Sequence, residues 1–128
     1  MGAGVIATLL GACQNQECEA ARLELAQTWE TLRNTATSRK QIPEASDLSK
    51  SEEEDRIKVW TAIEDRAELI RSSFQTTQVT IEPAQKARVE LDRLFKPLAS
   101  NDDPMTRGFA VTLADADKRL ETFRQACR

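Results

Sequence analysis

The chain has 128 residues, with 18 basic and 21 acidic side chains and a formal net charge of −3. This balance excludes the strongly basic surface that nucleic-acid binding requires, and the length suits one domain. The chain contains no histidine, which excludes histidine-based catalytic triads and histidine-containing zinc sites. We therefore expect a non-catalytic protein without a metal or cofactor.

The first predicted element is a short apolar segment. Residues 3–12, AGVIATLLGA, carry no charge, and ten residues make ~15 Å of helix, about half of a bilayer core. The segment is too short to span a membrane, but it has the length of the hydrophobic region of a secretory signal. The alternative is that residues 1–12 begin a buried helix and that Cys13 is an ordinary buried thiol.

The end of this segment, Leu10-Gly11-Ala12-Cys13, resembles the lipobox of bacterial lipoproteins. The pattern of that family is an aliphatic residue, two small residues and a cysteine. The resemblance implies that residues 1–12 are removed, that Cys13 carries a lipid anchor, and that residues 13–17 are the lipidated N-terminus and a short tether.

The resemblance also implies a location. Under the sorting rule of enterobacteria, Gln14 in place of Asp favours the outer membrane, with the protein facing the periplasm. Signals of this family normally carry Lys or Arg near their start, and Met1–Ala12 has neither. Two explanations stay open, a start codon upstream of Met1 or a chance match.

Residues 18–128 are expected to form an all-α domain of four helices, at about 16–39, 49–76, 82–97 and 103–127. Along each segment apolar residues recur at steps of three or four, which is the spacing of one helical face. The residues expected on these faces are Cys18, Ala21, Leu25, Thr28 or Trp29, Leu32 and Ala36; Ile57, Trp60, Ile63, Ala67, Ile70 and Phe74; Ala84, Ala87, Leu91, Leu94 and Leu98; and Met105, Phe109, Leu113, Ala116, Leu120, Phe123 and Cys127.

Breaks and capping signals separate the helices. Pro43 cannot continue a helix, and the second helix is expected to start near Ser49 or at Ser51, which has the capping-box spacing to Glu54. Thr80 and Asp103 are the caps expected for the third and fourth helices. Short connections favour an antiparallel four-helix bundle. A looser three-layer arrangement, with the second and third helices as a bent pair, is the alternative.

Two of the three cysteines are expected to form a disulfide. In an up-down-up-down bundle the first helix starts at the end where the last helix finishes, which brings Cys18 near Cys127. If Cys13 is lipidated in an exported protein, two thiols remain in an oxidising compartment. The alternative is a pair of small buried thiols without a bond.

The charged residues are expected to lie on solvated faces. Arginine outnumbers lysine, 12 to 6, and many arginines stand four residues from an acid, as in the pairs Glu52–Arg56 and Asp115–Arg119. Such pairs stabilise a helix surface by ~0.2–0.5 kcal/mol each. No spacing indicates carboxylates that converge on a metal ion.

The sequence predicts a membrane-anchored binding or structural module for envelope proteins. Its partner surface is expected in a shallow groove between the third and fourth helices, at Phe95 and Leu98, because the third helix is the shortest. An alternative is an envelope carrier or sensor for a small apolar or cationic ligand, held in a cleft lined by Trp60 and neighbouring phenylalanines. A further alternative is a cytoplasmic helical adaptor.

Overall fold

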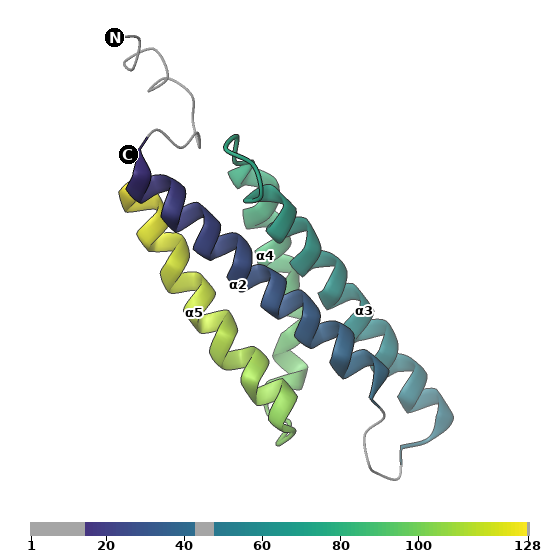
Figure 1. The fold of residues 1–128 in the computed structure, drawn as a ribbon. Helices are drawn as coiled ribbons and strands as arrows, with labels where there is room; N and C mark the ends of the chain where they lie inside the picture. The colour runs from purple at the N-terminus through teal and green to yellow at the C-terminus, as the bar shows by residue number, and fades with distance from the viewer. Residues whose placement is uncertain (1–14, 43–47, 128) are drawn as a thin grey trace.

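The computed structural model describes residues 15–42 and 48–127, so Cys13, the lipobox and Pro43 lie outside the described residues. The described chain forms the helices α2 (Gln16–Gln41), α3 (Lys50–Ser73), α4 (Ile81–Phe95) and α5 (Pro104–Ala126), with a short 3₁₀ helix, η1 (Lys96–Leu98), after α4 (Figure 1). These bounds agree with the four predicted segments to within a few residues.

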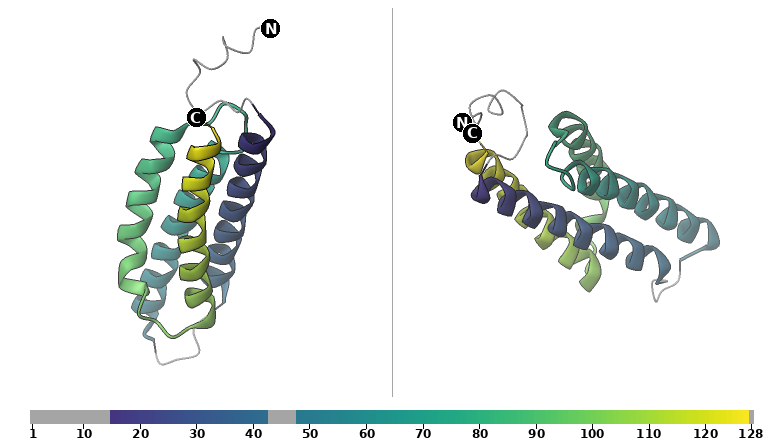
Figure 2. Two further views of the ribbon diagram at one scale, coloured as in Figure 1. Left: turned by 90° about the vertical axis from the view of Figure 1, so that its left-hand side faces the viewer. Right: turned by 45° about the horizontal axis from the view of Figure 1, so that its top comes forward.

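The helices form an antiparallel four-helix bundle, as the sequence predicts. The helix α2 packs on α3 and on α5, and α3 packs on α4, so the order across the bundle is α5–α2–α3–α4 (Figure 2). The first turn of α2 lies beside the last turn of α5 (Figure 1). We call this end of the bundle the disulfide end, for the bond described below.

The core follows the predicted faces closely. On the inner face of α2, where the spacing allows Thr28 or Trp29 at one step, Trp29 and the other expected residues are buried and Thr28 is only partly buried. In the half of the bundle away from the disulfide end, Trp60 packs edge-on against Phe109 and Phe95, with ring centroids 5.5 and 6.1 Å apart, and the Phe95 and Phe109 rings are 4.9 Å apart. Near the disulfide end, Phe74 and Phe123 make a second edge-on pair. These rings tie α3 and α4 to α5.

One predicted core position of α3 is wrong. Ile57 is 38% exposed, and its neighbour Arg56 is buried instead. The Arg56 Nη1 atom donates to the backbone carbonyl of Arg39, 2.7 Å away in the last turn of α2. Glu53, rather than the expected Glu52, accepts from the same guanidinium group. The buried arginine thus satisfies a helix-end carbonyl that has no partner within its own helix.

The disulfide end has a matching contact. Arg22 of α2 is buried, and its Nη1 atom donates to the carbonyl of Phe74, 2.8 Å away at the C-terminus of α3. Glu19 pairs with the same guanidinium group. The positive charge of each arginine also complements the negative end of the helix that it caps. The two contacts therefore fix α2 against α3 at both ends.

The start of α3 differs slightly from the predicted one. Ser49, the earlier of the two expected starts, caps the helix, and the capping box pairs Ser49 with Glu52 rather than Ser51 with Glu54. Thr80 precedes α4 as expected, but its side chain makes no capping hydrogen bond.

The start of α5 is anchored to the end of α2. As predicted, Asp103 caps α5, and its carboxylate accepts from the backbone N–H of Thr106 at 2.9 Å. The same carboxylate lies 3.0 Å from the Nε atom of the buried Arg39. Partial burial alone would raise the pKa of Asp103, but the hydrogen bonds from Thr106 and the charge of Arg39 outweigh it and hold the pKa below its ordinary value.

An ion cluster on the outer side links α2 to α3. The Glu68 carboxylate accepts from Arg71 at 2.6 Å and from Arg33 of α2 at 2.7 Å. The hydrogen bond from Arg71, helped by the one from Arg33, lowers the pKa of Glu68 from 4.5 to about 2, against the opposing effect of partial burial.

Replacing Glu68 should therefore change how stability depends on pH. A carboxyl group whose pKa is lowered by folding stabilises the protein above its unfolded-state pKa and loses that effect as the pH falls through its folded-state value. We expect Glu68→Gln to unfold at lower urea concentration than the wild type at pH 7. The difference should shrink between pH 4.5 and about 2. Urea titrations across this range check it, and a difference independent of pH would contradict it.

Candidate binding groove

The structure does not place the predicted partner surface at Phe95 and Leu98. Phe95 is only 5% exposed, because its ring packs in the cluster with Trp60 and Phe109. Leu98, in η1, is partly buried against the core. The chain turns from α4 into η1 here and carries both side chains inward. The residues predicted as a contact surface are thus core and core-edge residues.

Cys18 and Cys127 are joined in a disulfide. Their Cα atoms are 4.8 Å apart, and the bond connects residues 109 positions apart in the chain. Asn15 supports the same end in two ways. Its side-chain oxygen caps α2 by accepting from the N–H of Cys18 at 2.7 Å, and its Nδ2 atom lies 3.4 Å from the carbonyl of Ala126. The bond fastens the first turn of α2 to the last turn of α5.

A groove runs along the seam between α4 and α5, the pair of helices that the sequence singles out. It encloses about 360 Å³ in the half of the bundle near the disulfide end. The lining residues are Trp29, Ile70, Phe74, Ile81, Ala84, Gln85, Arg88, Val89, Ala116, Asp117 and Leu120. Although α3 packs closely on α4 and α2 on α5, α4 and α5 do not pack closely on each other.

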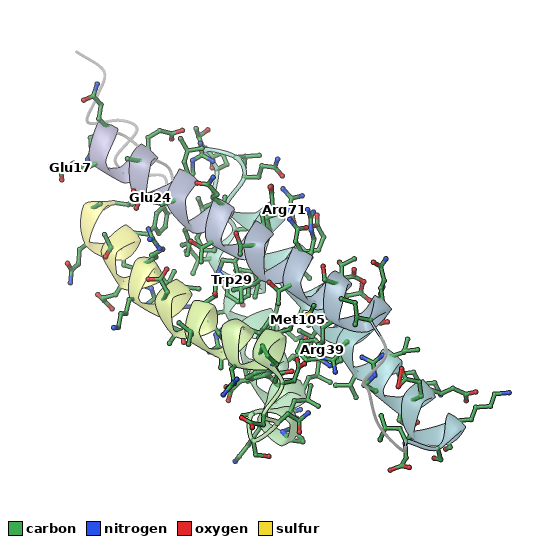
Figure 3. The ribbon with its side chains drawn as sticks, turned by 60° about the horizontal axis from the view of Figure 1, so that its bottom comes forward. Glu17, Glu24, Trp29, Arg39, Arg71 and Met105 are labelled. Atoms are coloured by element: carbon green, nitrogen blue, oxygen red, sulfur yellow. A yellow bond between two sulfur atoms is a disulfide. The ribbon has the colours of Figure 1, made fainter. Side chains whose placement is uncertain are left out.

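Small side chains explain why the groove stays open. Ala84 of α4 and Ala116 of α5 are both buried and both line it. An alanine side chain fills little of the space between two helices, so neither residue closes the opening. The floor is formed by Trp29, which lies on the inner side of α2 (Figure 3), together with Ile70 and Phe74. The interior is therefore strongly apolar.

An ion pair crosses the groove at the end that lies farther from the disulfide. The Nε and Nη2 atoms of Arg88 donate to the two carboxylate oxygens of Asp117, at 2.9 and 2.8 Å. Burial alone would lower the pKa of Arg88, but the paired hydrogen bonds to Asp117 outweigh it and raise the pKa. This two-point contact is the geometry in which arginine binds a carboxylate most strongly. It links α4 to α5 where their backbones stay apart.

Toward the disulfide end the groove adjoins a second hollow. This second hollow of about 250 Å³ shares Ile81 and Gln85 with the groove and is further lined by Phe123, Arg124 and Cys127. The groove and this hollow together follow the α4–α5 seam from Asp117 to Cys127. We call the Arg124–Cys127 side of this path its open end.

The lining of the groove differs from the predicted cleft. Trp60 belongs to the core cluster and does not line it, whereas Trp29 does. The sequence contained one signal for the groove, namely Val89, an apolar residue outside the inner face of α4 that is 61% exposed at the rim.

Within residues 15–42 and 48–127, no group of three or more carboxylate or cysteine side chains is placed to hold a metal ion. Of the helices that the structure describes, none has both the length and the hydropathy needed to cross a bilayer. Comparisons with protein-family models, with curated proteins and with solved structures found no match for this chain.

Proposed function

We propose that the protein is a lipid-anchored lipoprotein of the bacterial envelope, and that its bundle is a non-catalytic binding module facing the periplasm. The observation that carries the proposal is the Cys18–Cys127 disulfide. Structural disulfides persist in oxidising compartments such as the periplasm and are rare in the cytosol. The bond leaves Cys13, in the lipobox-like sequence, as the remaining cysteine of the three.

The disulfide end would then face the membrane. Only Gln14 stands between Cys13 and Asn15, which caps the first helix. Two residue steps of extended backbone span at most ~7 Å. An anchor on Cys13 therefore holds this end of the bundle at the lipid surface. The outer membrane is the membrane we propose, on the basis of Gln14.

The binding surface that we propose is the α4–α5 groove, in place of Phe95 and Leu98. A segment of an envelope protein is one class of occupant. A second candidate function, a carrier or sensor for a small apolar ligand, is favoured by the shape of the groove. Its volume of about 360 Å³ lies within the ~300–1,000 Å³ of small-molecule sites, and Trp29 and Phe74 give it an aromatic lining.

Metabolic labelling with radioactive palmitate tests the anchor. In bacteria that express the full chain with its native upstream codons, we expect the wild type to be labelled and recovered with the outer membrane. The variant Cys13→Ser should lose the label. The matched control Cys127→Ser should keep it, since that cysteine belongs to the disulfide. An unlabelled wild type, or label retained by Cys13→Ser, would contradict the proposal and favour a cytoplasmic adaptor.

A further inference from the structure

We propose that the α4–α5 groove binds the acyl chain of a free fatty acid, with the carboxylate at the open end beside Arg124. This inference rests on the proposed function for the source of the ligand, because the membrane to which the bundle is anchored supplies acyl chains. It goes beyond that function by naming the ligand class and its orientation.

The lining of the groove suits a hydrocarbon chain. The floor is made of Trp29, Ile70 and Phe74, and the two walls carry Ala84 and Ala116. The charged groups that line it, Arg88 and Asp117, are already paired with each other across the seam. A ligand deep in the groove thus meets apolar atoms, which favours burial of a chain without polar groups.

The length of the path fits one acyl chain. From Asp117 to Cys127 the path follows ten residues of α5, which corresponds to ~15 Å at 1.5 Å per residue. The hydrocarbon core of a bilayer is ~30 Å thick, so one leaflet of acyl chains measures about 15 Å. The Arg88–Asp117 pair closes the far end of the path. A single acyl chain of this length therefore fits between the open end and this ion pair.

The open end has the polar groups that a carboxylate needs. Arg124 supplies a guanidinium group, and the amide of Gln85 supplies further hydrogen-bond donors. The alternative orientation would place the carboxylate against the Arg88–Asp117 pair, where the Nε and Nη2 atoms of Arg88 already donate to Asp117. The polar head is therefore expected at the disulfide end.

The anchor explains how such a ligand reaches the groove. The open end lies at Cys127, which is bonded to Cys18 in the first turn of α2. With Cys13 anchored in the membrane, the backbone from Cys13 to Asn15, at most ~7 Å long, keeps that turn near the lipid surface. A fatty acid can therefore leave the membrane and enter the groove along a short path, with little exposure of its chain to water.

The two tryptophans provide a built-in test. Trp29 lines the groove, whereas Trp60 is fully buried in the other cluster. We would prepare the disulfide-bonded full chain with Cys13→Ser, and make Trp60→Phe and Trp29→Phe in that background, so that each protein keeps one tryptophan. The probe is dodecanoate brominated at its terminal carbon, used below its micelle concentration. We expect saturable quenching of Trp29 emission, at least fivefold stronger than that of Trp60.

Two exposed valines give a matched pair of variants. Val89 is 61% exposed and lines the groove, and Val111 is 72% exposed on α5 and does not. Because both side chains are exposed, we expect Val89→Asp and Val111→Asp to have little effect on folding, which circular dichroism checks. We expect Val89→Asp to weaken probe binding at least tenfold and Val111→Asp to change it less than twofold.

Arg124→Gln tests the position of the carboxylate. It should lower the affinity for the brominated acid but leave the affinity for its methyl ester unchanged.

Several outcomes would overturn the inference. They are an absence of saturable quenching, equal quenching of both tryptophans, or equal losses from the two valine variants. Sedimentation that shows a dimer lost in Val89→Asp but unaffected by the probe would assign the groove to a second copy of the chain. The palmitate-labelling experiment is independent of all of these. Labelling at Cys13 without probe binding would support the anchored module and contradict the fatty-acid site. Probe binding without labelling would contradict the anchor alone.

Discussion

Breaking the Cys18–Cys127 bond is expected to lower the free energy of unfolding by about 4–5 kcal/mol. The bond connects residues 109 positions apart, and in the chain-entropy model a loop of about 100 residues corresponds to ~4.7 kcal/mol. Domains of this size are stable by only about 5–15 kcal/mol, so the bond supplies a large part of the total. The bundle without it should be marginally stable at 37 °C.

Urea unfolding followed by circular dichroism measures this effect. The comparison uses the Cys13→Ser background, which prevents pairing through the remaining thiol. Dithiothreitol should shift the unfolding midpoint of this protein to much lower urea concentration. The matched double variant Cys18→Ala and Cys127→Ala should start at that lower midpoint and not respond to the reductant. A disulfide-bonded protein with the same midpoint before and after reduction would contradict the prediction.

This bond could be predicted from the sequence because it depends on topology more than on detail. The steps of three and four residues define four helices, and short connections make them antiparallel. That arrangement alone brings Cys18 of the first helix near Cys127 of the last. The same reasoning correctly placed Asp103 at the start of α5. Local periodicity and capping chemistry are thus enough for the fold class, the helix bounds and the covalent link.

The buried arginines show where the pattern stops being sufficient. Periodicity favoured Ile57 for the core, yet Arg56 is buried and Ile57 is exposed. The reason lies outside α3, because the guanidinium group satisfies the carbonyl of Arg39 at the end of α2. A hydrophobic pattern counts arginine as a surface residue. It contains no information about carbonyl groups that another helix leaves without partners.

The sequence predicts a groove between the third and fourth helices, and one lies between α4 and α5, but Phe95 and Leu98 do not line it. The shortness of the third helix suggested incomplete coverage of the core, and α4 with η1 is indeed short. Which part of the seam stays open depends on how far α4 stands from α5 at each level. Where the two helices stand apart, small residues such as Ala84 and Ala116 leave the space between them unfilled. A one-dimensional pattern lists both alanines as core residues and does not show that they line the same opening.

Phe95→Ala should be among the most destabilising single substitutions in the bundle, at about 3–5 kcal/mol. If Phe95 formed an exposed partner surface, its loss would leave stability nearly unchanged, because exposed substitutions usually stay within ±0.5 kcal/mol. Its ring instead contacts Trp60 and Phe109, with centroids 6.1 and 4.9 Å away. Removing the ring would leave a cavity between α3, α4 and α5.

The matched control for Phe95→Ala is Val111→Ala, on the exposed side of α5. We expect it to unfold within about 0.5 kcal/mol of the wild type in the same urea titration. Because Phe95 lies outside the groove lining, a second readout separates packing from binding. At low temperature, where the weakened variant is still folded, Phe95→Ala should bind the brominated dodecanoate about as well as the wild type. A stable Phe95→Ala variant with impaired binding would return the functional surface to Phe95.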